Sequence, residues 1–254
     1  MRLTIKIGSN VLTRSDGSLD VTRMSALVDQ IAELRQQGHE VILVSSGAVA
    51  SGRSELKHIQ HDLDSARQRQ LFSAVGQAKL INRYFELFRE YGIAVGQVLT
   101  TKENFADSEH RQNQENCIGV MLENGVLPIV NENDTVSITE LMFTDNDELS
   151  GLIAQMTDSD MLIILSNIDG LYTGQPSDPA SRLISIVKPG KDLSDYIQPS
   201  KSSAGRGGMQ SKSSVAQRTA AAGIGVVIAN GKREGILVRL MNDRDNTPCT
   251  EFLI

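Results

Sequence analysis

The strongest constraint on the fold of this chain is a repeated order of helix pattern, glycine and apolar strand. Six short apolar runs predict strands, at residues 3–7, 41–44, 95–99, 127–130, 161–165 and 225–228. Helical patterns cover residues 24–34, 66–91, 107–124 and 212–222, and each is followed by a glycine, at Gly38, Gly92, Gly125 and Gly223. Glycine readily adopts the left-handed conformation that ends a helix. The alternation predicts an α/β fold in three layers, with a central, mainly parallel sheet between helices.

Length and composition limit the other possibilities. The 254 residues, 40% of them hydrophobic, suffice for one large α/β domain or two small ones. Without an internal repeat or a break in composition, we expect a single domain over residues 1–254. The net charge of -6 offers no basic surface for nucleic acid, which is not an expected partner. With no signal-peptide pattern and no membrane-length apolar run, we expect a cytoplasmic protein without membrane contact. Cys117 and Cys249 suit two reduced thiols.

A lysine in the first predicted strand is a candidate for chemistry. Lys6 alternates with Ile5 and Ile7 and is followed closely by Gly8. Its ammonium is poorly solvated unless it reaches the end of the strand, where a glycine turn lets an anion approach the backbone. A lysine on an edge strand is the structural alternative, and the residues alone leave both open.

Two stretches rich in glycine and serine lead into predicted helices. In residues 44–52, small side chains would let backbone amides and serine hydroxyls face an anion, although a serine N-cap explains the pattern equally well. In residues 203–212, Lys212 stands at a helix start, where a cation is unfavourable unless an anion offsets it. Ser211 occupies the glycine position of a Walker loop, so this is not one. Residues 198–209 are expected to form a mobile or ligand-gripping loop.

Carboxylates and carboxamides crowd together after the strand at residues 127–130. Residues 131–134 read Asn-Glu-Asn-Asp and residues 145–147 read Asp-Asn-Asp. Open α/β sheets place their ligands just beyond the carboxyl ends of strands. The acidic groups could hold Mg²⁺, orient lysines or bind an ammonium, whereas each half taken alone could simply form a turn. Together with the two lysines and the glycine-rich helix starts, the cluster indicates phosphoryl transfer.

The order of these motifs resembles that of the amino-acid kinase family over essentially the whole chain. The matching motifs are VSSGAVASGR at 44–53, AVGQ at 74–77, NEND at 131–134, DND at 145–147, DGLYT at 169–173 and GGMQSK at 207–212. The likeness is strongest to members that transfer the ATP γ-phosphoryl group to the side-chain carboxylate of glutamate, the first step of proline biosynthesis. Relatives often carry Thr-Asp where this chain has Ser166-Asn167, and many continue into a PUA domain, which is not expected here.

The resemblance implies roles for individual residues. Lys6 and Lys212 would stabilise the transferred phosphoryl group, and Asp147 would position both lysines. The implied glutamate site, in the N-terminal part, consists of Ser46, Asn131, Asp134, Asp145 and Asn146. The implied ATP site, mainly in the C-terminal part, consists of Lys6, Ser166, Asn167, Arg206, Gly207, Gly208, Met209, Gln210, Ser211 and Lys212. Mg²⁺ is an implied cofactor, with no residue assigned as its direct ligand.

The resemblance also implies a homo-oligomer and a functional link to the reductase that would consume the acyl phosphate. One rival is a kinase for another acidic metabolite, such as an acetylglutamate-like compound. A second rival is a non-catalytic sensor of nucleotide or amino acid. The presence of Lys6, Lys212 and Asp147 argues against the sensor, because losing one of them is the simplest route to an inactive kinase.

Overall fold

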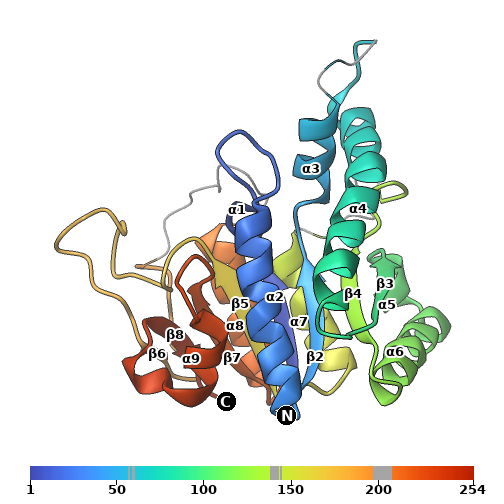
Figure 1. Ribbon diagram of the computed structural model, residues 1–254. Helices are drawn as coiled ribbons and strands as arrows, with labels where there is room; N and C mark the ends of the chain where they lie inside the picture. Colours follow the sequence, from blue (N-terminus) through green and yellow to red (C-terminus); the bar gives the residue numbers. More distant parts are fainter. Residues whose placement is uncertain (57, 59–60, 138–142, 144, 197–207) are drawn as a thin grey trace.

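Figure 1 shows the computed structural model, which describes residues 1–56, 58, 61–137, 143, 145–196 and 208–254. The strands are β1 (Arg2–Ile7), β2 (Glu40–Ser45), β3 (Val95–Thr100), β4 (Leu127–Glu132), β5 (Met161–Ser166), β6 (Ile186–Val187), β7 (Gly225–Asn230) and β8 (Cys249–Phe252). The helices are α1 (Ser9–Leu12), α2 (Val21–Gln36), α3 (Ala48–Glu55), α4 (Ser65–Arg89), α5 (Glu103–Ala106), α6 (Ser108–Glu123), α7 (Asn146–Met156), α8 (Met209–Ala221) and α9 (Ile236–Asn242). All six predicted strands are present, each longer than predicted by one or two residues at one end or both.

The described strands form one sheet in the order β3-β4-β2-β1-β5-β7-β8-β6. Neighbouring strands run parallel except β7 and β8, which are antiparallel. The predicted mainly parallel sheet is confirmed. β1 lies inside it, and Lys6 stands opposite Val44 of β2 and Ile164 of β5. The alternative that Lys6 belongs to an edge strand is therefore wrong.

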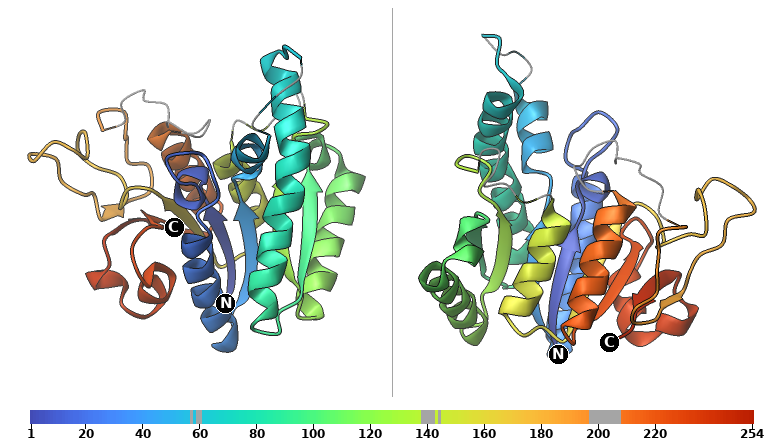
Figure 2. Two further views of the ribbon diagram at one scale, coloured as in Figure 1. Left: turned by 45° about the horizontal axis from the view of Figure 1, so that its top comes forward. Right: turned by 180° about the vertical axis from the view of Figure 1, so that it is seen from behind.

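Helices cover both faces of the sheet (Figure 2), which confirms the three-layer architecture. On one face, α2, α4 and α9 pack in a single apolar cluster with Leu3, Ile5 and Ile7 of β1. On the other face, α7 and α8 pack against β5 and β7, and α6 and α7 pack against β2 and β4. Successive side chains of a strand point to opposite faces, so Lys6 points to the side that α7 and α8 cover.

The predicted glycines mark the ends of helices. Gly38, Gly92, Gly125 and Gly223 follow α2, α4, α6 and α8, with φ of 86°, 66°, 69° and 88°. At these left-handed residues each helix ends and the chain turns into the next parallel strand, at the side of the sheet where the parallel strands begin. The parallel strands consequently end at the same edge, where their terminal residues can form one site.

A few sequence expectations concern other parts of the molecule. Of the helices in the described ranges, none is both long and apolar enough to cross a membrane. Cys117 is exposed, Cys249 is buried and both are free thiols. Most of the stretch expected to be a mobile or ligand-gripping loop, residues 198–207, lies outside the described residues, whereas Gly208 and Met209 lie within them.

Candidate active site

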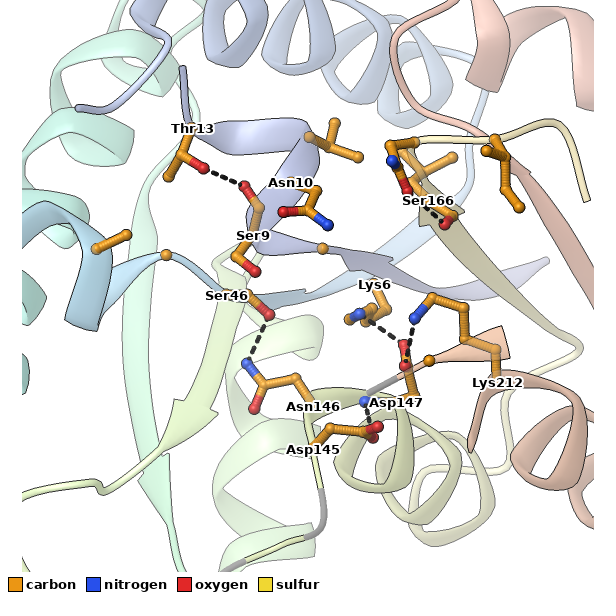
Figure 3. Close-up of a pocket in the computed structure, with 18 of the residues that line it drawn as sticks. Lys6, Ser9, Asn10, Thr13, Ser46, Asp145, Asn146, Asp147, Ser166 and Lys212 are labelled. Carbon is orange, nitrogen blue, oxygen red and sulfur yellow. Dashed lines mark hydrogen bonds and ion pairs between the residues drawn. The ribbon is translucent and has the colours of Figure 1, made fainter. Parts of the chain in front are cut away.

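A cleft of about 670 Å³ opens at the carboxyl ends of β1, β2, β4 and β5 (Figure 3). Most of the expected site residues line it: Lys6, Ser46, Asn131, Asp134, Asp145, Asn146, Asp147, Ser166, Asn167, Gly208, Met209 and Lys212. Gln210 and Ser211 are not among its lining residues, and Gln210 is exposed. Arg206 and Gly207 lie outside the described residues. Residues far apart in sequence thus meet in one cavity.

Lys6, Asp147 and Lys212 form a buried ion cluster in the floor of the cleft. Lys6 Nζ lies 2.5 Å from Asp147 Oδ1, and Lys212 Nζ donates to Asp147 Oδ2 over 2.9 Å. Asp147 is fully buried, Lys6 is 4% exposed and Lys212 is 9% exposed. With both lysines protonated, the cluster carries one unbalanced positive charge. Buried charge of this kind calls for a compensating anion.

Burial and mutual contact shift the ionisation of this cluster. Burial has the largest effect on the pKa of Lys6 and lowers it; Lys212 acts in the same direction, and attraction to Asp147 opposes them without cancelling them. For Asp147, burial would raise the pKa, but the two lysines together outweigh it and hold the pKa below its ordinary value. Asp147 is therefore a carboxylate at neutral pH. An incoming anion would favour the charged form of Lys6.

The start of α7 holds Asp147 in place. Asp145, the residue just before α7, caps the helix: its Oδ1 accepts hydrogen bonds from the backbone amides of Asp147 (2.9 Å) and Glu148 (3.0 Å). A carboxylate in the first helical turn is favoured by the helix dipole. Residues 145–147, which taken alone could have been a simple turn, are thus a helix start, whereas the chain after residues 131–133 does form a turn at residues 134–136. Asp145 Oδ2 is buried and lacks a hydrogen-bond partner within the described part of the chain.

Lys212 lies in the first turn of α8, which begins at Met209 and not at Lys212 as predicted. The glycine pattern around residues 207 and 208 obscured this start, since glycine weakens a helix prediction. A lysine near a helix amino terminus is opposed by the dipole, and Asp147 supplies one compensating anion. This compensation is shared with Lys6, so an anionic ligand would still be favoured.

Carboxamide groups organise the other end of the cleft. Asn146 Nδ2 lies within hydrogen-bond distance of Asn131 Oδ1 (2.9 Å), Ser46 Oγ (3.0 Å) and the Ser45 carbonyl oxygen (3.2 Å). Asn131 Nδ2 in turn donates to Gln77 Oε1 over 2.8 Å. Since Ser46 Oγ accepts from Asn146, its own proton remains available for a ligand acceptor. The network links β2, β4, α4 and α7.

Asp134 has a charged neighbour that the sequence reasoning missed. Arg69 of α4 donates from Nε to Asp134 Oδ1 over 2.8 Å, and its Nη2 donates to the same oxygen. Arg69 Nη2 also lies 3.3 Å from Glu132 Oε2. Arg69 lines the cleft beside Asp134 and Asn131. Asp134, one of the residues of the implied glutamate site, is therefore part of an ion network.

The opposite end of the cleft follows the end of β5. Ser166 Oγ lies 3.5 Å from Asn167 Oδ1. Two residues further on, Asp169 accepts hydrogen bonds from Arg233 over 2.6 and 2.7 Å and from Asn230 over 3.1 Å. These contacts tie the turn after β5 to the segment that follows β7. Tyr172 and the tight turn around Gly174 continue the wall of the cleft.

Gly8 keeps the approach to the lysines open. A Cβ atom at this position would lie 3.2 Å from the Leu165 carbonyl oxygen and 3.4 Å from Lys6 Nζ. The absence of a side chain therefore leaves space beside the Lys6 ammonium. This agrees with the expected role of the glycine turn after β1.

The helix that follows Ser46 is fixed by close packing of α3 on α4. A Cβ at Gly52 would lie 1.8 Å from the Phe72 carbonyl oxygen, and one at Gly76 would lie 1.8 Å from the Ala48 carbonyl oxygen. α3 begins after Gly47, whose φ is 106°, without a side-chain cap. The structural alternative for this stretch, a serine N-cap with close helix packing, is therefore wrong about the cap and confirmed for the packing.

The features missed from sequence share a physical cause. Arg69, Ser73 and Gln77 recur every four residues within a predicted helix, and this polar stripe is a signal that could have been read. The partners of these side chains lie at and just after the end of β4. A local sequence pattern does not predict which strand end packs against a helix. The lining residue Thr13 carries no comparable signal, whereas Tyr172 falls in the DGLYT motif at 169–173, to which no site role was assigned.

The fold and the site define an open, mainly parallel α/β domain with a buried lysine pair at the carboxyl ends of its strands. The model of the Amino acid kinase family matches residues 1–230, and the chain belongs to that family.

Named relatives agree with this membership. A glutamate 5-kinase of Bacteroides thetaiotaomicron is 69% identical over 252 residues, which are 99% of this chain and 70% of the relative. A glutamate 5-kinase of Chlorobaculum tepidum is 48% identical over 93% of this chain, which spans 65% of that relative. A carbamate kinase from Giardia lamblia, solved with AMP-PNP, has the same fold, with a TM-score of 0.68, 15% identity and coverage of 99% of this chain and 98% of that one.

Proposed function

We propose that this protein transfers the γ-phosphoryl group of ATP to the side-chain carboxylate of L-glutamate, giving L-glutamyl 5-phosphate and ADP. The observation that carries the proposal is the buried Lys6-Asp147-Lys212 cluster, with its unbalanced positive charge at the floor of the cleft. The name shared by the relatives at 69% and 48% identity supports glutamate as the acceptor.

The reaction needs charge stabilisation more than acid-base chemistry. A side-chain carboxylate oxygen attacks the γ-phosphorus, the bond from that phosphorus to the β-γ bridging oxygen breaks, and ADP leaves with the electron pair. The attacking carboxylate is already ionised, so no general base is required. The ammonium groups of Lys6 and Lys212 would neutralise charge on the phosphoryl oxygens. Asp147 would hold both lysines on the same side of the transferred group.

Glutamate would lie at the end of the cleft formed by Ser46, Asn131, Asp134, Asp145 and Asn146. The free proton of the Ser46 hydroxyl suits a ligand carboxylate. The carboxylates of Asp134 and Asp145 suit an ammonium, and Asp145 Oδ2 lacks a hydrogen-bond partner among the described residues. The charge pattern therefore fits a zwitterionic amino acid. The N-terminal part of the domain would supply most of this site.

ATP would lie towards Ser166, Asn167 and the start of α8, in the C-terminal part of the domain. Gly8 places no side chain beside the Lys6 ammonium, which would let a phosphate group approach it from that side. Arg206, Gly207, Gln210 and Ser211 stay predictions as nucleotide contacts. Within the described ranges, no group of three histidine, cysteine or acidic side chains forms a metal site. Mg²⁺ would therefore be held largely by the phosphate oxygens, as it often is at nucleotide sites, and would neutralise their charge.

The proposed product is an acyl phosphate, which water hydrolyses readily. A reductase that consumes it in the next step of proline synthesis is a chemically consistent partner, and rapid capture would protect the product.

A coupled assay tests the proposal. ADP release is measured with glutamate, N-acetylglutamate and aspartate, and hydroxylamine traps the acyl phosphate as a hydroxamate. We expect glutamate to give the largest kcat/KM and an equal yield of hydroxamate and ADP. Preference for N-acetylglutamate would identify a kinase for another acidic metabolite, and binding of ATP without turnover of any acceptor would identify a sensor. Either result would contradict the proposal.

A further inference from the structure

One face of α4 carries three polar side chains at successive helical turns. Arg69, Ser73 and Gln77 are spaced four residues apart, so they lie above one another on the helix. We refer to these three residues as the α4 ladder. Ser73 and Gln77 are buried. Polar groups placed inside a protein need partners. Among the described residues, the ladder contacts Asn131 and Glu132 at the end of β4 and Asp134 just beyond it.

The α4 ladder contacts each functional residue of that segment. Gln77 Oε1 accepts from Asn131 Nδ2 over 2.8 Å, and Ser73 Oγ lies 3.4 Å from Asp134 Oδ2. Arg69 bonds Asp134 Oδ1 through both Nε and Nη2, and Nη2 also reaches Glu132. Arg69 thus anchors one oxygen of the Asp134 carboxylate. This anchoring fixes the direction in which the other oxygen points.

Charge gives Arg69 a role that its two ladder neighbours cannot share. Glu132 and Asp134 are both buried, and the Arg69 guanidinium lies between them. Two desolvated carboxylates repel each other unless a cation stands close by. Glu132 Oε1 also accepts from the backbone amide of Phe143 over 3.0 Å. The guanidinium therefore keeps both acidic groups in one arrangement.

We propose that Arg69 is a positioning residue that prepares Asp134 to bind the α-ammonium group of the amino-acid substrate. The proposal deepens the proposed function and rests on it. Arg69 contributes no bond to the reacting atoms. By neutralising Glu132 and fixing Asp134, it makes the site selective for an acceptor with a free ammonium group. Arginine suits this task because its planar group carries several donors, which here bond Asp134 Oδ1 and Glu132 Oε2 at set angles.

Substitutions on α4 provide a matched test. Arg69→Gln removes the charge, Arg69→Lys keeps a charge without the fork of donors, and Arg67→Gln removes an arginine whose side chain is 72% exposed and pairs with Asp64. The Arg69 side chain is 22% exposed. We expect Arg69→Gln to raise the KM for glutamate by about tenfold or more while changing the KM for ATP by less than about twofold. Arg69→Lys should recover part of the loss, and Arg67→Gln should behave as the wild type.

A second ligand separates positioning from direct contact. Glutarate is glutamate without the ammonium group, and its inhibition constant against glutamate is measured for each variant. If Arg69 acts through Asp134 on the ammonium, Arg69→Gln leaves glutarate inhibition nearly unchanged. In an Asp134→Asn background, adding Arg69→Gln should raise the KM for glutamate by less than about threefold. Equal weakening of glutarate, or fully additive effects of the two substitutions, would overturn the proposal.

Folding and basal activity are controlled separately. Thermal melting is recorded for every variant, and if Arg69→Gln does not fold, Arg69→Lys carries the test. That variant should then raise the KM for glutamate and not that for ATP, and unchanged KM values would overturn the role of Arg69. A wild-type chain without glutamate-dependent ADP release would contradict the proposed function itself. If the wild type is active and Arg69→Gln has the same KM for glutamate, only the role proposed for Arg69 is contradicted.

Discussion

Lys6 and Lys212 depend on one another through the carboxylate that they share. Each pairs with a different oxygen of Asp147, and neither is appreciably exposed. Removing either lysine would leave the other better neutralised but would halve the ammonium groups available to the phosphoryl oxygens. The effect should appear in the chemical step, because charge on those groups changes during transfer.

We therefore expect Lys6→Ala and Lys212→Ala each to lower kcat by about a hundredfold or more. Steady-state kinetics with both substrates saturating would measure this. Lys79→Ala is the matched control, since Lys79 forms an exposed pair with Glu55 on the surface. Variants that melt at lower temperature with kcat intact would show that the two lysines are structural.

The lowered pKa of Lys6 predicts an alkaline loss of activity. As the pH rises through a pKa below the ordinary 10.5, Lys6 loses its charge, and kcat/KM for ATP should fall. Lys6→Arg should move this limb to higher pH, because arginine stays protonated. The pH profile of the wild type and this variant, at saturating glutamate, measures the shift.

Protein stability should follow a different course from activity. Between the lowered pKa of Lys6 in the folded state and the ordinary value in the unfolded state, the unfolded chain binds more protons, so the contribution of Lys6 to stability increases with pH. Thermal melts across the same range therefore distinguish deprotonation from unfolding. If Lys6→Arg loses kcat/KM at the same alkaline pH as the wild type, another group is responsible for the loss.

At the scale of elements, the packing of α3 on α4 leaves no room for a methyl group. Gly76→Ala would place a Cβ against the Ala48 carbonyl oxygen, whereas Gly119→Ala, in α6, meets nothing within 4 Å. We expect Gly76→Ala to lower the free energy of unfolding by about 2 kcal/mol or more, and Gly119→Ala to raise it by about 0.5 kcal/mol. Urea denaturation would measure both values. Similar changes in the two variants would contradict the close helix contact.

Elements with strong local patterns were predictable from sequence. The apolar runs predicted the six longer strands, and the helical patterns with the glycines that follow them predicted four helices. These signals lie within a few neighbouring residues, so they can be recognised in the sequence. β6 has two residues and β8 joins the sheet antiparallel, and neither carries a pattern that distinguishes it from a loop. The sequence likewise predicted most of the polar residues that meet in the cleft, although Gln210 and Ser211 do not line it. It did not predict Arg69, because the partner of a helical side chain is decided by packing.

At the scale of the whole molecule, the cleft joins segments from both ends of the sequence. Of its lining residues, Lys6 belongs to β1, Asp147 to α7, Lys212 to α8 and Arg69 to α4. Figure 1 labels these four elements. A ligand that compensates the lysine cluster should therefore stabilise the entire domain. Binding to the folded state alone adds about 2.7 kcal/mol at a ligand concentration one hundred times Kd.

We expect a non-hydrolysable ATP analogue with Mg²⁺ to raise the melting temperature by about 5–10 °C at such a concentration. A chelator should reduce the shift, because the metal neutralises part of the phosphate charge. Lys212→Ala is the comparison variant and should show a smaller shift. An equal shift in the variant, measured at the same analogue concentration, would place the phosphates away from the lysine cluster.

The interior position of β1 has a consequence for how the protein is made. β1 leaves the ribosome well before β5, yet β5 is one of its two neighbours, with Leu3 paired to Met161. At about 5–20 residues per second, synthesis leaves that edge of β1 without its partner for about 8 to 30 s. An apolar strand edge left open for so long pairs readily with other nascent chains. The yield of native protein should therefore depend on translation speed and on chaperones that cover β1 until β5 has been made.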